Sequence, residues 1–221
     1  MNRWLKRLYL LWALLVFLIV FIKGGLSADN LTHAGITLFF FFALWLYRRR
    51  KKPISNPRAF FILRCVLYAA VVEGFYMITA PVLPSLRFTA GMTLSHMVAN
   101  YLIDLSFTVP AYLFIFYVVW RLIKKYSYTP WEYAILFAFG QALGDGSRTF
   151  LFNPGLLVFI PYVMINYHAM NVAPFLSIRE NLQSEGKGGL WKWFAPIVVV
   201  FGAYLISGLV IYSVAAILKI S

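Results

Sequence analysis

The chain has 221 residues, of which 62% are hydrophobic and 12% charged, and its formal net charge is +13. A water-soluble domain carries about 25% charged and about 45–50% apolar residues, so this chain would expose an apolar surface to water. The composition therefore excludes an ordinary soluble protein and predicts one membrane domain, with no room for a second, soluble domain.

Apolar runs recur along the chain, and a helix needs about 20 such residues to cross the hydrocarbon core. Long unbroken runs favour helices over a barrel, because a helix satisfies its own backbone amides. We predict an all-α polytopic transmembrane helix bundle with seven spans, although six to eight spans are compatible with the runs. The approximate spans are 8–22, 31–47, 59–83, 102–123, 131–143, 150–165 and 194–218.

Two regions depart from a simple span. Residues 89–123 would form a helix of roughly 52 Å, which is too long for one straight crossing. We therefore expect either a kink at Pro110 or an interfacial or re-entrant segment at 85–101. The fifth run is short, and its end carries Gly140 and Gly144, a small-xxx-small pair that predicts close helix packing.

The basic residues favour one orientation, because Lys and Arg concentrate in cytoplasmic loops. With seven spans and a cytoplasmic N-terminus, fifteen of the 20 Lys and Arg residues lie inside and four outside, while Arg64 falls within the third span. We therefore predict a cytoplasmic N-terminus and a cytoplasmic loop at 177–193. The expected location is a prokaryotic cytoplasmic membrane.

The first segment also has the pattern of a secretory signal, with three basic residues (Arg3, Lys6 and Arg7), then an apolar stretch, then Gly-Leu-Ser-Ala at 25–28. Retention of this helix gives the better charge distribution downstream, so we expect it to remain uncleaved. An intact-mass measurement distinguishes the two outcomes.

The basic residues also indicate partners. The block Arg48, Arg49, Arg50, Lys51 and Lys52 follows an apolar run, which fits attraction to anionic headgroups of the lipid bilayer. A soluble basic patch interleaved with aromatic residues is missing, so we predict no nucleic-acid partner. The aromatic content of 19% fits packing against a membrane-protein partner as well.

Ionisable side chains at the centre of a membrane helix cost about 2.5–3.5 kcal/mol each on insertion scales, so each requires a reason. Glu73 lies inside the third run, and four polar residues from His96 to Thr108 recur every four positions, on one helix face. That face either lines a polar pathway or is the wet side of an exposed turn. The predicted topology places the candidates for an outward polar cavity together: Glu73, His96, Asn100, Asp104, Asp145 and Arg148.

A second group of polar residues is expected near the cytoplasmic side, either as a polar mouth or as interfacial residues that cap helices. Its members are Glu132, Asn166, His168 and Asn171. We find no nucleotide-binding, serine-hydrolase or zinc motif, and one imidazole among 96–104 is too few for a metal site. We therefore predict no metal and no cofactor.

Three functions are compatible with these sequence features. The first is a small transporter or binding protein for a small polar or amphipathic molecule, in which Glu73 or Asp104 carries a proton. The second is an intramembrane enzyme that acts on a lipid-like substrate, with the same carboxyls and a histidine as general acid and base. The third is an accessory subunit of a membrane complex.

Overall fold

The computed structural model describes residues 2–49, 54–182, 184, 186 and 188–220 of the chain. All the regular elements of the described part are helices, which confirms the predicted all-α polytopic helix bundle. Three short 3-10 segments accompany the α-helices: η1 (Pro84–Leu86), η2 (Pro154–Phe159) and η3 (Arg179–Asn181). The α-helices are α1 (Arg3–Gly24), α2 (Ala28–Arg49), α3 (Pro57–Tyr76), α4 (Leu94–Lys125), α5 (Pro130–Asp145), α6 (Ser147–Phe152), α7 (Ile160–Ile178) and α8 (Trp191–Leu218).

Six helical segments in the described residues are long and apolar enough to cross a membrane. These are α1, α2, α3, α4, the stretch Pro154–Asn181 and α8. Helix α5 has 16 residues, or about 24 Å of helix, which is shorter than the roughly 30 Å hydrocarbon core. The protein is therefore a multi-pass membrane protein, while the number of seven spans and the cytoplasmic N-terminus stay predictions.

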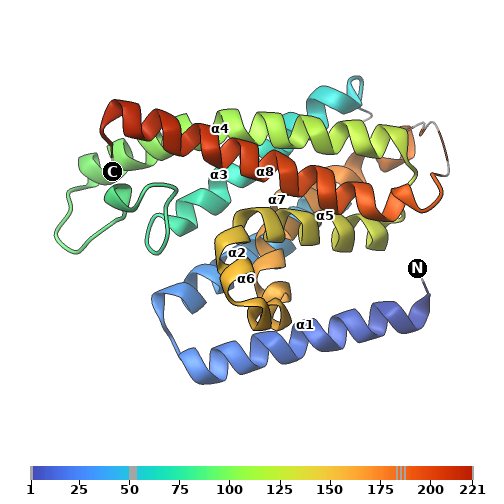
Figure 1. Ribbon diagram of the computed structural model, residues 1–221, viewed down its shortest axis with the longest axis horizontal. Helices are drawn as coiled ribbons and strands as arrows, with labels where there is room; N and C mark the ends of the chain where they lie inside the picture. The colour runs from blue at the N-terminus through green and yellow to red at the C-terminus, as the bar shows by residue number, and fades with distance from the viewer. Residues whose placement is uncertain (1, 50–53, 183, 185, 187, 221) are drawn as a thin grey trace.

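The long helices run roughly along one axis, and α1 begins and α8 ends at opposite ends of it (Figure 1). Helix α7 packs against α2, α3 and α5, while α4 packs against α3 and α8, and α8 packs against α5. We call the end where α1, α3, α5 and α8 begin the basic end. The other end, which holds the loop between α3 and α4, is the opposite end.

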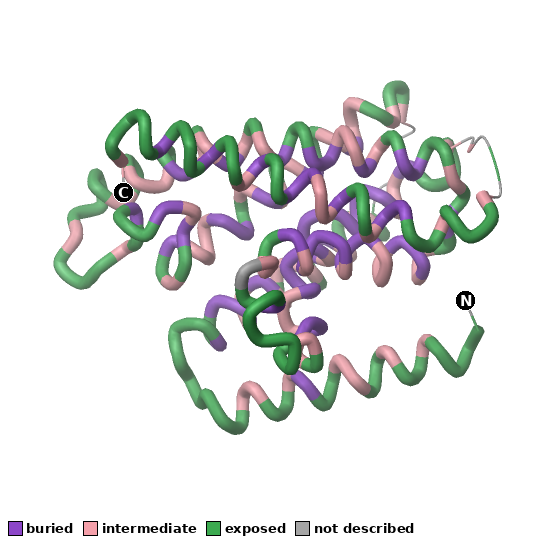
Figure 2. Tube along the Cα trace, viewed as in Figure 1, coloured by how far each residue is buried: buried purple, intermediate pink, exposed green. Residues whose placement is uncertain are grey.

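Burial differs sharply between the first helix and the seventh. Val16 is the buried residue of α1, whereas most residues of α7 are buried. Figure 2 shows the same contrast, with α1 mostly exposed along its length and buried segments gathered at the middle of the bundle. Helix α7 is therefore the central helix, and its Phe175 ring stacks on Tyr133 of α5 with centroids 3.8 Å apart.

The contact between α5 and α8 depends on two glycines. A Cβ atom at Gly140 would lie 2.7 Å from the carbonyl oxygen of Pro196, and one at Gly144 would lie 2.5 Å from Cβ of Tyr204. Both distances are below van der Waals contact, so a larger side chain would push the helices apart. The close packing predicted from the small-xxx-small pair is confirmed.

The sixth helix differs from the predicted run at 150–165. Residues 147–159 form α6 and η2, and the long helix begins at Ile160 and continues to Ile178. Pro154 and Pro161 stand in the first turns of η2 and α7, where the missing N–H needs no partner. The prolines therefore begin elements, and the polar residues that ended the apolar run lie inside α7.

The fourth helix is longer than the predicted segment at 102–123. Helix α4 is continuous over 32 residues, with Pro110 inside it, and it begins one turn after the Gly91 turn. Thr93 caps its N-terminus by accepting a hydrogen bond from the His96 N–H at 3.4 Å. Residues 94–101, expected in an interfacial or re-entrant segment, are therefore part of the same helix as 102–125.

Candidate functional site

Glu73 lies in the last turn of α3 and is buried against α4. Its Oε1 atom accepts a short hydrogen bond from the hydroxyl of Tyr112, which is itself buried on α4. The carboxyl is therefore held by a neutral donor between two long helices.

Asp104 lies on α4 and is fully buried. Its Oδ1 atom accepts a hydrogen bond from the backbone N–H of Val82 at 3.0 Å, and this contact ties the loop after α3 to α4. Its Oδ2 atom is buried and has no hydrogen-bond partner among the described residues. One oxygen of Asp104 therefore holds the loop after α3, and the other is a buried acceptor without a described partner.

Asp145 is the last residue of α5, and its carboxylate accepts a hydrogen bond from Tyr167 of α7 at 2.7 Å. Asp104 and Asp145 lie close enough to Glu73 to affect it electrostatically, and the three carboxylates would repel one another if all were ionised. We call these three residues the carboxyl cluster. It brings together, from three different helices, half of the side chains expected in the outward polar cavity.

The remaining candidates of that cavity have other positions. His96 is exposed in the first turn of α4, and its Nδ1 atom lies 3.0 Å from the Thr93 hydroxyl. Asn100 donates a hydrogen bond from its side-chain amide to the Leu86 carbonyl at 3.1 Å, which holds η1 against α4. The side chain of Arg148 lies outside the described part of the structure.

The four polar residues expected at the cytoplasmic side do not form one cluster. Glu132, at the start of α5, accepts a hydrogen bond from Lys192 at 2.8 Å. His168 belongs to α7 and contacts the carbonyl of Ala134 in α5 at 3.1 Å. Asn166 instead donates to the Tyr76 hydroxyl at 2.5 Å, at the far end of α3. Residues two apart point to different sides of a helix, so Asn166 and His168 face different neighbours.

Asn171, the last member of that group, is buried in α7. Its side-chain nitrogen has no hydrogen-bond partner among the described residues. Asn171 thus adds an unsatisfied donor to the interior of the central helix.

Sequence reasoning missed a polar cluster between α2 and α7. The His33 ring stacks on Tyr162 with centroids 3.9 Å apart, and its Nε2 atom lies 3.4 Å from the Tyr76 hydroxyl. Tyr162 also donates a hydrogen bond to Asn30 at 2.7 Å. The signal was a group of polar residues around the start of the predicted span at 31–47, namely Asp29, Asn30, Thr32 and His33, which form the first turns of α2.

The basic block begins in the last turn of α2 with Arg48 and Arg49. The guanidinium of Arg49 lies over the Trp45 ring, 4.2 Å from its centroid. Arg50, Lys51 and Lys52 lie outside the described residues. Binding of this block to anionic lipid remains a proposal.

The described residues contain no group of three His, Cys, Asp or Glu side chains that could hold a metal ion. Comparison with known proteins gives no match: no family model, no curated protein and no solved structure resembles the chain. Function must therefore be argued from the geometry of the carboxyl cluster and its surroundings.

Proposed function

We propose that this multi-pass membrane protein binds or transports a small polar or amphipathic molecule, with the carboxyl cluster at the centre of its polar site. The observation that carries the proposal is the buried Glu73 carboxyl and its hydrogen bond to Tyr112. A charged or polar group in this position costs insertion energy, and apolar residues would pack the same helices as well. Retention of a carboxyl there is expected where it has a function.

Asp104 gives the proposal a second line of support. Buried polar atoms are normally hydrogen-bonded to protein, to ordered water or to a ligand. The Oδ2 atom of Asp104 has no protein partner in the described residues, so a water molecule or a polar group of the ligand is expected to donate to it.

The cluster also suits the transfer of protons. A tyrosine hydroxyl donates to an ionised carboxylate and accepts from a protonated carboxylic acid. Glu73 can therefore gain or lose a proton and keep Tyr112 as its partner. We propose that this exchange couples the passage of the ligand to proton movement.

We further propose that the opposite end faces the outside of a prokaryotic cytoplasmic membrane. The support is the distribution of Lys and Arg, which favours a cytoplasmic basic end. Arg58, Arg121 and Arg179 belong to that end, whereas Lys23 and Arg87 lie towards the opposite end. Cysteine labelling from each side, at Lys23 and at Lys124, tests this orientation.

Reconstituted vesicles test the function. Uptake of radiolabelled organic acids, amino acids, sugars and lysolipids is measured with and without an imposed pH gradient. Glu73→Gln should reduce the uptake of the responding probe at least tenfold, because the side chain can no longer exchange a proton. Glu180→Gln, which changes an exposed carboxyl of η3, is the matched control and should retain uptake. Unchanged uptake in Glu73→Gln would remove the main support.

An enzyme that acts on a lipid-like substrate receives less support. General acid–base chemistry on the predicted plan requires a histidine close to a carboxyl. His33 and His168 contact backbone carbonyls, and His96 contacts a threonine hydroxyl. Unimpaired turnover in Asp104→Asn would exclude a catalytic role for that carboxyl.

The accessory-subunit hypothesis has its own test. The exposed apolar length of α1 could pack against lipid or against a partner helix. Purification in mild detergent distinguishes these cases, because a monodisperse lone protein argues against a permanent partner.

A further inference from the structure

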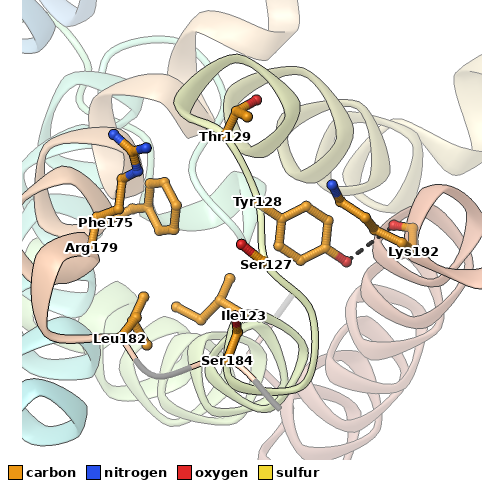
Figure 3. A pocket seen from close by; sticks show the side chains of 9 residues that line it. All are labelled: Ile123, Ser127, Tyr128, Thr129, Phe175, Arg179, Leu182, Ser184 and Lys192. Atoms are coloured by element: carbon orange, nitrogen blue, oxygen red, sulfur yellow. Dashed lines mark hydrogen bonds between the residues drawn. The ribbon is translucent and has the colours of Figure 1, made fainter. Parts of the chain in front are cut away.

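A second candidate site lies at the basic end, away from the carboxyl cluster. It is a cavity of about 500 Å³ between the end of α4, the start of α5, the end of α7 and the start of α8. Figure 3 shows its lining side chains, which come from all four of these regions. The described lining residues are Ile123, Ser127, Tyr128, Thr129, Phe175, Arg179, Leu182, Ser184 and Lys192.

Two basic side chains line this cavity, and Lys192 shares its charge with Glu132 beside the lining. Arg179 and Lys192 are the cationic members of the described lining, and none of those nine residues is acidic. Lys192 is held in place by Glu132 at 2.8 Å and lies over the Tyr128 ring at 5.5 Å from its centroid. Arg179 is exposed and forms no ion pair within the described residues. Because Arg179 is exposed, an anion in solvent can reach its guanidinium.

Neutral donors stand beside the cations. Ser127 is exposed, and its hydroxyl makes no hydrogen bond within the described residues. Thr129 and Glu132 form the capping box of α5, so the helix N-terminus beside the cavity already has protein partners and adds no donor to the site. A guanidinium and a free hydroxyl are both groups that donate to phosphate oxygens.

The other wall of the cavity is apolar. Ile123, Phe175 and Leu182 supply hydrocarbon and aromatic surface next to the cations. A ligand that fills both parts must be amphipathic, because a fully hydrated anion would leave the apolar wall without contacts. Trp191 and Trp193, in the first turn of α8, have the aromatic character expected at the level of lipid headgroups.

We propose that this cavity binds a phosphate-bearing molecule, with Arg179 and Ser127 as donors to the phosphate and the apolar wall against its organic part. The site is independent of the carboxyl cluster and of the basic block that follows α2. A phosphate of this kind reaches the cavity either on a lipid headgroup or on a soluble phosphate ester.

The experiment uses the full chain and two probes. Native mass spectrometry measures retention of phosphatidic acid against phosphatidylcholine, and thermal shift measures binding of glycerol 3-phosphate. Arg179→Gln should weaken binding of the preferred probe roughly tenfold, as loss of a charge-assisted hydrogen bond does. Binding of phosphatidic acid alone identifies a headgroup site, whereas binding of glycerol 3-phosphate identifies a soluble source.

Two further variants keep the proposal falsifiable. Ser127→Trp fills the cavity without changing its charge, so it should weaken binding even if Arg179→Gln fails to fold. Lys124→Gln removes an equal charge from the exposed last turn of α4, outside the cavity, and should bind as the wild type does. Equal binding by wild type, Arg179→Gln and Ser127→Trp overturns the proposal. Equal loss in Lys124→Gln also overturns it, because general surface charge then explains the attraction.

Discussion

At the basic end, Glu132 contacts the charged group of Lys192, whereas two members of the carboxyl cluster, Glu73 and Asp145, accept from tyrosine hydroxyls. Glu132 accepts from Lys192 at 2.8 Å, and Asp145 accepts from Tyr167 at 2.7 Å. An ion pair requires both partners to stay charged, but a hydroxyl bonds to a carboxyl in either protonation state. The ion pair is stable only while both of its groups are charged, whereas the contacts of Glu73 and Asp145 are compatible with the proton exchange that we propose.

The largest expected effect comes from the packing of α8 against α5, the helix that carries both Glu132 and Asp145. Gly144→Val places methyl groups where Cβ alone would already lie 2.5 Å from Tyr204. Overpacking of this kind should lower the free energy of unfolding by about 3 kcal/mol. Unfolding in mixed micelles measures it. An unchanged value would mean that α5 and α8 are held together elsewhere.

A smaller loss is expected from the ion pair. Lys192→Gln removes the charge that Glu132 contacts at 2.8 Å, which should cost about 2 kcal/mol. Lys124→Gln, at an exposed position, should change the unfolding free energy by less than about 0.5 kcal/mol. Equal effects of the two variants in the same unfolding assay would show that this partly buried pair adds nothing to the free energy of unfolding beyond what an exposed charge adds.

Asp104 separates structure from chemistry within the carboxyl cluster. Asp104→Ala leaves the Val82 N–H without its acceptor and should cost about 1.5 kcal/mol. Asp104→Asn keeps an acceptor oxygen, so its thermal stability should stay near that of the wild type. A loss in Asn as large as in Ala would show that the charge itself, and not the acceptor, holds the loop.

The smallest effect is expected at Tyr112. Tyr112→Phe removes the donor to Glu73 and should cost about 1 kcal/mol. A double-mutant cycle with Glu73→Leu, which removes the acceptor, should give a coupling energy of about the same size, because the two groups share one hydrogen bond. Added salt should leave this coupling unchanged but weaken the Lys192–Glu132 pair. Salt dependence at Tyr112 would remove the distinction between the two regions.

The sequence predicted the class of fold and the α5–α8 contact well, because both follow from local composition. Apolar runs identify helices in lipid, and Gly140 and Gly144 are four residues apart on one face. It predicted the limits of α7 poorly. Asn166 and Asn171 ended the apolar run, although protein and not lipid surrounds them in the structure.

For the candidate site, the sequence identified the costly residues but not their partners. Glu73, Asp104 and Asp145 were visible because carboxyls are rare in such a chain. Tyr112 and Tyr167 were not distinguishable among the 14 tyrosines, since partner choice depends on contacts between distant helices. His33 was missed for the same reason, because Tyr76 and Tyr162 come from other elements.

The central place of α7 has a consequence for biogenesis. Its main packing partners, α2, α3 and α5, all precede it in the chain, so they can enter the bilayer first during synthesis. The buried amides of Asn166 and Asn171 would be costly for α7 alone in lipid, but less so against helices that are already inserted. Because α7 is synthesised after these three helices, its buried amides can pack against protein without first being exposed to lipid.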